Sequence, residues 1–362
     1  MSHSSSSGHD SSSGHDLAGY GWDDERERSF TAYRAKGLVP GRVIGVDRGR
    51  CDVVTEHGAV RAGTSLVRSA DPVELPCTGD WAALRPGRDP ELAALLPRRG
   101  VIVRSAVSRS SHGQALAANV DVAAVVVSAA VDVKPGRVER LLALAWEGGA
   151  LPVVVLTKID ESADLAWTVA EVRRSAPGVE VVPTSAVTGE GIDALQAVLT
   201  GTVVLLGPSG AGKSTLGNAL LGAAVLETGA VRAQDNKGRH TTVRRQMVRL
   251  PNGAVLIDTP GLRGVGLLDA EEGLRRTFAD VEELARECRF GDCGHESEPG
   301  CAVLAAIAEG ALDRRRLDGY RRLQRENAWA ASRADARLRK ERADRWKAIT
   351  KSMRTTTRDR RR

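Results

Sequence analysis

Residues 203–221 read VVLLGPSGAGKSTLGNALL, an apolar run followed by a glycine-rich turn and a helical segment. The turn fits the pattern G-x-x-x-x-G-K-[ST]. In this pattern glycines let backbone N–H groups surround an anion at a helix N-terminus, lysine reaches the outer phosphates, and the hydroxyl ligates Mg²⁺. We therefore expect a nucleotide to be bound by Gly207, Pro208, Ser209, Gly210, Ala211, Gly212, Lys213, Ser214 and Thr215.

The segments around this loop alternate between apolar runs and helical stretches. Valine- and leucine-rich runs occupy residues 122–127, 153–156, 179–182 and 254–257, and another covers 244–250. Runs without alternation of polar residues are typical of strands that are buried on both faces. The pattern predicts an α/β domain whose sheet has about six strands, most of them parallel, between layers of helices.

Three further motifs follow these runs, at the carboxyl edge where open α/β sheets bind ligands. Asp160 in Thr157-Lys158-Ile159-Asp160 can accept two hydrogen bonds from guanine that adenine cannot supply, which predicts GTP. Ser185 and Ala186 are expected to contact the guanine carbonyl through the backbone. In D-T-P-G we expect Asp258 to hold the water shell of Mg²⁺ and Gly261 to donate its N–H to the γ-phosphate.

The order of these motifs is unusual. The base motif precedes the phosphate loop, whereas an ordinary GTPase begins with that loop. The sequence therefore predicts a circularly permuted GTPase domain, since a permutation preserves the site when the old termini are close together.

The residue that would orient the attacking water is not beside D-T-P-G, because Leu262 follows Gly261. The segment between the phosphate loop and D-T-P-G contains Gly238-Arg239-His240-Thr241-Thr242. We expect His240 to position the water and Thr242, or else Thr241, to ligate Mg²⁺. The alternative is that His240 is an ordinary exposed loop residue.

A possible metal site follows the sheet domain. Cys288, Cys293, His295 and Cys301 offer three thiolates and one imidazole within 14 residues. This donor set is typical of Zn²⁺ in closed structural sites. We therefore expect one structural zinc ion that holds the C-terminal helices.

The two ends of the chain differ from its centre. The sequence SSSGHD occurs twice before residue 17, and this low-complexity stretch cannot form a core. Residues 311–362 contain 19 basic and 7 acidic residues, so they carry +12 while the rest carries −6. Such a basic tail favours a polyanionic partner, although a solvated charged helix is the alternative. Trp329 and Trp346 could stack on RNA bases or pack between helices.

Taken together, these motifs resemble the ribosome small-subunit-dependent GTPase A family, circularly permuted GTPases of bacterial ribosome assembly. The resemblance covers roughly residues 38–325 and includes Gly79-Asp80-Trp81 and Ala118-Asn119-Val120-Asp121. It implies slow GTP hydrolysis accelerated by the 30S subunit, contacts with 16S rRNA and a role in late subunit maturation. Thr157 departs from this family's usual asparagine.

The resemblance also sharpens the domain organisation. Short strands with turn signals predict a small β domain, and the resemblance implies an OB-type barrel. We expect a low-complexity extension, this barrel, the GTPase domain, a helical zinc-binding domain and a basic tail, at residues 1–37, 38–105, 106–270, 271–325 and 326–362.

Other readings of the sequence remain open. One is an RNA-binding assembly factor for which GTP is only a ligand, and another is a P-loop ATPase or kinase. No apolar run reaches the ~20 residues that a membrane-spanning helix needs, and the start lacks a secretory signal. We therefore expect a cytoplasmic protein with no membrane partner, monomeric when free.

Overall fold

The N-terminal part is a closed five-stranded barrel. The computed structural model describes residues 17–105, 113–226, 246–259, 266–267 and 269–331. The barrel strands follow the order β1-β2-β3-β5-β4, and β4 pairs back to β1. This arrangement confirms the small OB-type barrel. The strands are β1 (Val39–Asp47), β2 (Arg50–Thr55), β3 (Gly58–Gly63), β4 (Trp81–Arg85) and β5 (Glu91–Leu95).

Residues 17–37 fold against this barrel, so the expected N-terminal extension as far as residue 37 is wrong for this stretch. They form η1 (Leu17–Tyr20) and α1 (Asp24–Arg34). Phe30 is fully buried, and the ring of Trp22 meets that of Trp81 edge-on at 4.8 Å. These aromatic side chains supply the apolar burial that the Ser- and Gly-rich repeats lack. The repeats themselves lie outside the described residues.

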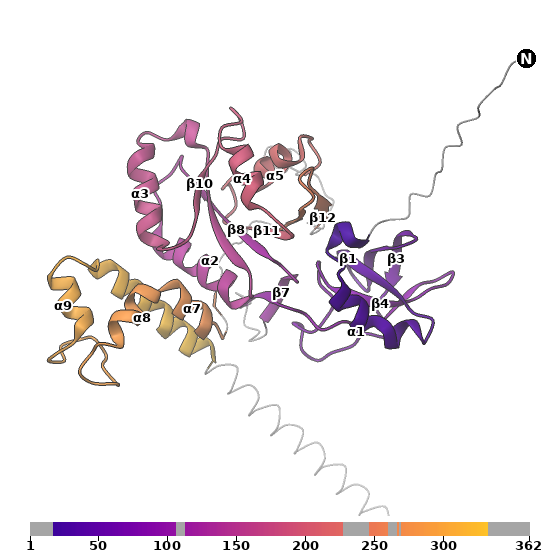
Figure 1. Cartoon of the computed structure of the whole chain (residues 1–362), viewed down its shortest axis with the longest axis horizontal. Helices are drawn as coiled ribbons and strands as arrows, with labels where there is room; N and C mark the ends of the chain where they lie inside the picture. Colours follow the sequence, from indigo (N-terminus) through magenta and orange to yellow (C-terminus); the bar gives the residue numbers. More distant parts are fainter. Residues whose placement is uncertain (1–16, 106–112, 227–245, 260–265, 268, 332–362) are drawn as a thin grey trace, which may run out of the picture.

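A six-stranded sheet forms the centre of the molecule, in the order β10-β9-β8-β11-β13-β12 (Figure 1). Its strands are parallel except β12, which pairs antiparallel with β13 at the edge. This confirms the predicted α/β fold. The strands are β8 (Val122–Ser128), β9 (Leu151–Thr157), β10 (Val181–Pro183), β11 (Thr202–Leu206), β12 (Gln246–Arg249) and β13 (Val255–Asp258).

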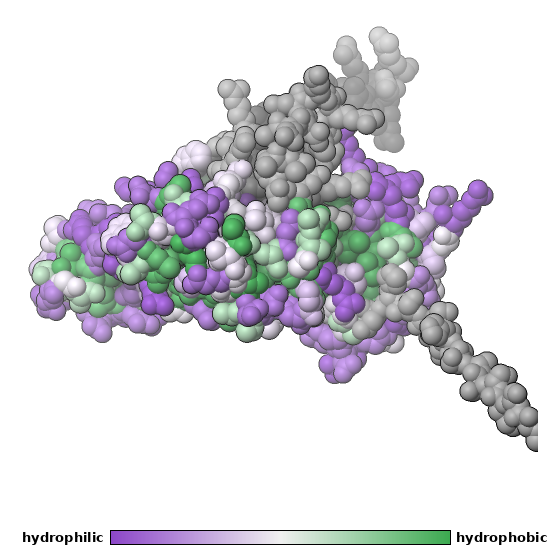
Figure 2. Space-filling view, turned by 90° about the horizontal axis from the view of Figure 1, so that it is seen from above, coloured by the Kyte–Doolittle hydropathy of each residue, from purple (hydrophilic) through white to green (hydrophobic). Residues whose placement is uncertain are grey.

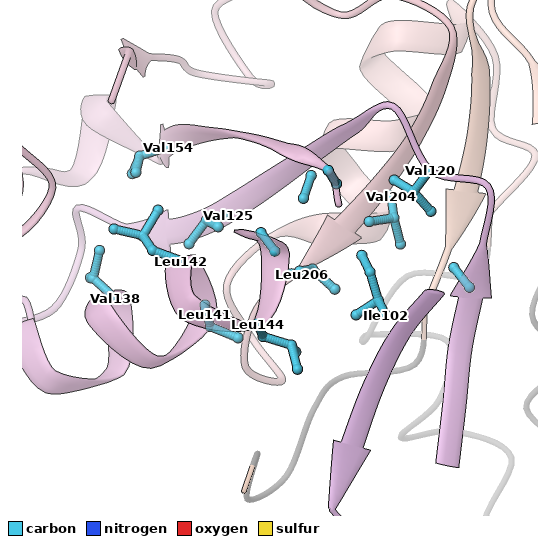
Figure 3. Packing of buried hydrophobic residues seen from close by; sticks show 14 of the residues in the cluster. Ile102, Val120, Val125, Val138, Leu141, Leu142, Leu144, Val154, Val204 and Leu206 are labelled. Atoms are coloured by element: carbon cyan, nitrogen blue, oxygen red, sulfur yellow. The ribbon is translucent and has the colours of Figure 1, made fainter. Parts of the chain in front are cut away.

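Helices cover both faces of this sheet. On one face, Val138, Leu141 and Leu142 of α2 point toward Val125 and other sheet residues (Figure 3). The apolar faces of α4 and α5 pack on the opposite face. The two cores explain why the strands are apolar along their whole length. The helices are α2 (Pro135–Glu147), α3 (Leu165–Ser175), α4 (Ile192–Val198) and α5 (Lys213–Leu221), with η2 (Ile159–Glu161) after β9.

The C-terminal part is helical and packs against α2 (Figure 1). It contains α7 (Glu271–Thr277), α8 (Ala279–Ala285), α9 (Ala302–Ala308) and a helix at residues 314–331. Asn327 is buried, and its Oδ1 accepts a hydrogen bond from the Ala270 N–H at 2.9 Å. The last helix therefore extends beyond residue 325, the expected end of the helical domain, and Asn327 still packs against the domain there.

The surface mixes hydrophilic and hydrophobic residues on the face shown in Figure 2. Among the described helices, none combines the length and apolar character that crossing a membrane requires. Trp329 is 61% exposed, and Trp346 lies outside the described residues.

Asn119 joins the barrel to the sheet domain. Its side-chain amide donates to the Gly79 carbonyl at 2.9 Å, and its Oδ1 accepts from the Arg99 N–H at 3.0 Å. Its φ of 53° lies in the left-handed region that asparagine tolerates better than most residues. A small hairpin of β6 (Val101–Ser105) and β7 (Gly113–Ala118) precedes it. The Gly79-Asp80-Trp81 and Ala118-Asn119-Val120-Asp121 motifs of the sequence therefore meet at this junction.

We predict that Gly79→Ala destabilises the protein more than Gly49→Ala does. Both glycines have positive φ, 97° and 71°, but a Cβ at Gly79 would lie 2.1 Å from the Ala118 carbonyl oxygen, whereas Gly49 has open space. Backbone strain alone costs about 1–2 kcal/mol, and the clash should bring the loss at Gly79 to about 3 kcal/mol or more. Urea unfolding measures both losses. Equal losses would contradict the tight contact.

Candidate functional site

The predicted nucleotide motifs meet at one edge of the sheet. The register pairs Leu206 with Val125 and Ser128 with Thr157, so β11, β8 and β9 end close together. The loops that follow these strands carry the phosphate motif and the base motif. Neighbouring strands lie about 4.8 Å apart, which places both loops within reach of one nucleotide.

The phosphate loop has a backbone that favours glycine. Gly210 and Gly212 adopt φ of 83° and 87°, and a Cβ at Gly207 would lie 2.7 Å from the Val126 carbonyl oxygen. The buried Lys213 amine donates to the carbonyls of Gly207 and Pro208 at 3.0 and 2.9 Å. The loop therefore has the shape of an anion cradle at the start of α5. Ser214 and Thr215 lie in the first turn of that helix.

Thr157 connects the base motif to the phosphate loop. Its hydroxyl lies 2.7 Å from the Ala211 carbonyl oxygen and 3.2 Å from that of Val127, and the side chain is buried. A hydroxyl has one proton to donate, so these acceptors share it. The threonine that stands where the resembling family has asparagine therefore still holds the two loops together.

The base side of the site is built by two loops. Lys158 has φ of 59°, and its amine lies 3.4 Å from the Glu161 carboxylate. Asp160 follows in η2 and is exposed, while the Ile159 N–H donates to the Thr184 carbonyl at 3.3 Å. This bond ties the base motif to the loop after β10.

Ser185 fixes the shape of that second loop. It is fully buried, and its hydroxyl accepts from the N–H groups of Val187 and Thr188 at 3.2 and 3.1 Å. Ala186 follows it and is half-buried. The two residues expected at the guanine carbonyl therefore lie in a turn that is tied to Asp160's loop.

Asp258 ends β13 on the other side of the phosphate loop. The next residue, Thr259, was missed by the sequence analysis, and its hydroxyl donates to the Leu205 carbonyl at 2.5 Å. This bond holds the chain after Asp258 against β11. Ser214 in the first turn of α5 and Asp258 at the end of β13 carry oxygen ligands of the kind that Mg²⁺ prefers. Four predicted site residues lie outside the described residues: His240, Thr241, Thr242 and Gly261.

A cavity of about 680 Å³ borders the phosphate loop between β8 and α2. Ser209 and Gly210 line one side of it, and Lys158 lines another. Lys134 and Arg137 at the start of α2 also line the cavity. The sequence around them contains no motif that would have predicted a place in the site. These three cations outnumber the two carboxylates of the lining, Asp132 and Glu161, and the resulting positive charge favours a polyphosphate.

The Cys and His residues come together as predicted. Their four ligand atoms all lie within 4.8 Å of one another. The Cys288 Sγ is 3.6 Å from the His295 Nδ1 and 3.8 Å from the Cys301 Sγ, and the His295 Nδ1 is 3.4 Å from the Cys301 Sγ. A tetrahedral zinc ion separates its sulfur and nitrogen ligands by about 3.5–3.8 Å. All four donors therefore fit zinc in chemistry, and Cys288, His295 and Cys301 also have nearly the spacing of zinc ligands.

The loop that presents His295 is held by Glu298. The carboxylate of Glu298 accepts hydrogen bonds from the N–H groups of Gly294, Glu296 and Ser297 at 2.7–3.0 Å. Its own N–H and these three donors lower the pKa of Glu298 to about 2. Because His295 has φ of 56°, the loop needs this local support. Cys301 lies at the start of α9, inside the C-terminal core.

We predict that Thr157→Val weakens GDP binding about tenfold, because it removes the tie between the base motif and the phosphate loop at nearly constant volume. Thr157→Ser keeps the hydroxyl and is the matched control, with affinity close to that of the wild type. Isothermal titration calorimetry measures both values. If the valine variant binds GDP as the serine variant does, the tie has no role in binding.

We also predict one tightly bound zinc per chain. Cys293→Ala should lose the metal and lower the thermal unfolding midpoint, since the site adjoins the C-terminal core. Cys51→Ala removes a buried thiol of the barrel and should leave the zinc content unchanged. Atomic emission spectrometry gives the metal content. A full zinc complement in the Cys293 variant would exclude this site.

Comparisons with known proteins place the chain in a family. The model of the RsgA GTPase family matches residues 95–268. A protein of Streptomyces coelicolor, the small ribosomal subunit biogenesis GTPase RsgA, is 58% identical over 330 residues, which cover 90% of each chain. Its namesake from Streptomyces avermitilis is 56% identical over 352 residues, 96% of this chain and 95% of the relative.

Solved structures agree on the fold. YjeQ from Thermotoga maritima superposes with a TM-score of 0.58 at 25% identity, covering 79% of this chain and 97% of that one. YloQ, described as a circularly permuted GTPase, gives a TM-score of 0.56 at 22% identity, with 80% and 94% covered, and shows the fold alone. The chain belongs to the RsgA family of small ribosomal subunit biogenesis GTPases.

Proposed function

We propose that the protein binds the small (30S) ribosomal subunit late in its maturation and hydrolyses GTP to GDP and phosphate with turnover that the subunit stimulates. Family membership supports the GTPase activity and the link to small-subunit assembly. The observation that carries GTP binding at a single site is the hydrogen bond from Thr157 to the Ala211 carbonyl, since it joins the guanine motif to the phosphate loop. One nucleotide can then span Asp160 and Lys213.

Each residue of the site has a defined task in this proposal. The Asp160 carboxylate accepts hydrogen bonds from the guanine N1–H and amine. Ser185 and Ala186 contact the guanine carbonyl through their backbone. The Lys213 amine exchanges the carbonyls of its own loop for phosphate oxygens. Ser214 and Asp258 would hold Mg²⁺, which neutralises charge on the phosphates when bound.

The water-positioning residue in this proposal is His240. It belongs to Gly238-Arg239-His240-Thr241-Thr242, between the phosphate loop and D-T-P-G. Thr242, with Thr241 as the second choice, would complete the Mg²⁺ ligands, and the Gly261 N–H would contact the γ-phosphate. An imidazole can accept a proton or hydrogen bond from water near neutral pH, which Leu262 cannot do.

The other parts of the chain would contact RNA. OB-type barrels commonly bind nucleic acid on their open face, and residues 311–362 carry a net charge of +12. We propose 16S rRNA as the partner of the barrel and of this basic segment, and zinc as the ion that stabilises the helical domain. We also propose a cytoplasmic location, where subunits are assembled, and a monomeric free protein.

We predict that 30S subunits accelerate GTP hydrolysis by the wild type and that His240→Ala loses about a hundredfold or more of the stimulated rate while it keeps GTP affinity. Phosphate release and GTP titration measure the two quantities. Lys213→Ala is the control for loss of binding, since it should fail in both assays.

The outcomes separate the alternatives. If 30S subunits bind but do not accelerate the wild type, the protein is an RNA-binding assembly factor for which GTP is a ligand. If His240→Ala hydrolyses GTP as fast as the wild type, His240 does not position the water. If ATP competes with GTP on equal terms, Asp160 does not face the base.

A further inference from the structure

A second cavity, of about 410 Å³, lies at the junction of the barrel and the GTPase domain. Asp121, Leu151 and Thr202 line it, and they precede or begin β8, β9 and β11. The cavity is therefore at the amino edge of the sheet, opposite the phosphate loop. Because β11 has five residues of about 3.3 Å each, the two sites are about 17 Å apart.

Two nearly buried arginines line this cavity. Arg42 of β1 is 1% exposed and Arg26 of α1 is 6% exposed. Within the described residues neither guanidinium makes an ion pair, and each has an Nε atom that is buried without a hydrogen-bond partner. Buried charges in proteins are ordinarily paired, so this is an unusual arrangement.

The groups that contact these arginines are neutral. Arg42 donates to the Thr202 hydroxyl at 3.1 Å and to the carbonyls of Tyr20 and Asn119 at 3.3 Å. Arg26 donates to the Asn119 Oδ1 at 3.3 Å. Both guanidinium groups also lie over the ring of Trp81, at 4.7 and 5.4 Å from its centroid. These contacts solvate the charges in part but do not neutralise them.

The charge balance of the cavity is positive. Arg99 adds a third guanidinium at its rim, although Asp23 and Glu25 pair with it from outside the cavity. Asp121 is the one carboxylate among the lining residues, and its Oδ2 already accepts from the Thr202 N–H at 2.7 Å. Three guanidinium groups and one carboxylate therefore line the cavity, and the two carboxylates that pair with Arg99 lie outside the lining.

The pKa values of Arg42 and Arg26 reflect their burial and the positive charges around them. Burial, together with repulsion from Arg26 and against the attraction of Asp121 and Asp80, lowers the pKa of Arg42 to about 9. Burial and the charge of Arg99 also lower the pKa of Arg26, against the attraction of Asp23, Asp121 and Glu25. A bound anion would relieve both the desolvation and the repulsion.

We propose that this junction cavity binds a small phosphate-type oxyanion, which Arg26 and Arg42 hold from the barrel side and which lies against the GTPase domain. Guanidinium groups match the planar pairs of oxygens that phosphate presents. The volume accommodates inorganic phosphate or pyrophosphate. The occupant would neutralise the buried charge and fasten the barrel to the edge where β8 and β11 begin.

The test is thermal unfolding of the full chain at increasing phosphate concentration, with ionic strength held constant by NaCl. A saturating non-hydrolysable GTP analogue with Mg²⁺ keeps the whole nucleotide site filled, the γ-phosphate position included, so the shift reports a second site. We expect the unfolding midpoint of the wild type to rise with phosphate in a saturable way. Arg26→Gln should raise the apparent Kd about tenfold or more, since it removes a charge-assisted contact.

Arg28→Gln is the matched control, because Arg28 lies on the same helix, is exposed and does not line the cavity. It should respond to phosphate as the wild type does. If Arg26→Gln fails to fold, Arg99→Gln replaces it, since Arg99 is at the rim and its side chain is 45% exposed. That variant should weaken phosphate binding about threefold or more.

Three results would overturn the proposal. The first is the absence of a saturable shift in the wild type with phosphate and with pyrophosphate. The second is an equal response in the Arg28 variant and the cavity variants, which would indicate a general effect of anions. The third is binding of a short single-stranded RNA that depends on Arg26 while free phosphate has no effect, which would make the site an RNA contact.

Discussion

The parallel pairing of β8 with β9 on one side and with β11 on the other is the constraint on which the site depends. Each pairing fixes the height at which a strand ends. The base motif and the phosphate loop therefore reach the same edge of the sheet, although 46 residues lie between Asp160 and Gly207 in the sequence. The two motifs also occur in the reverse of the order found in an ordinary GTPase. Spatial adjacency in a sheet needs register, and it does not need sequence order. A permuted chain can thus build an ordinary nucleotide site.

Much of the site could be predicted because its signals are local. The phosphate loop, the Thr157–Asp160 motif and the four metal ligands are short patterns whose chemistry is readable from residue type and spacing. The contribution of Thr259 could not be found in this way, because its acceptor is the Leu205 carbonyl on another strand. The same holds for Arg26 and Arg42. Charged residues are usually exposed, and only the docking of α1 and the barrel on the sheet buries them.

The helix α2 connects the two halves of the molecule. Its first turn borders the cavity beside the phosphate loop, and its middle carries the buried Glu139, which pairs with Arg316 at 3.1 Å. Further along, Gly273 of α7 approaches so closely that a Cβ would lie 2.1 Å from the Ala143 carbonyl oxygen. The buried ion pair and the close contact at Gly273 both oppose movement of the C-terminal helices along α2. The metal-binding helices are therefore held firmly to the element next to the nucleotide.

The strand order also governs how the protein can form during translation. The ribosome releases β8 and β9 well before β11, so β8 has a partner on one side only until residue 206 has emerged. Meanwhile the backbone N–H and C=O groups along the other side of this valine-rich strand lack their native partner, a state prone to mispairing. The permuted strand order leaves the finished nucleotide site unchanged, but it lengthens the time during which one side of β8 is unpaired in the nascent sheet. The core of the sheet domain is complete only when the second half of the chain has been synthesised.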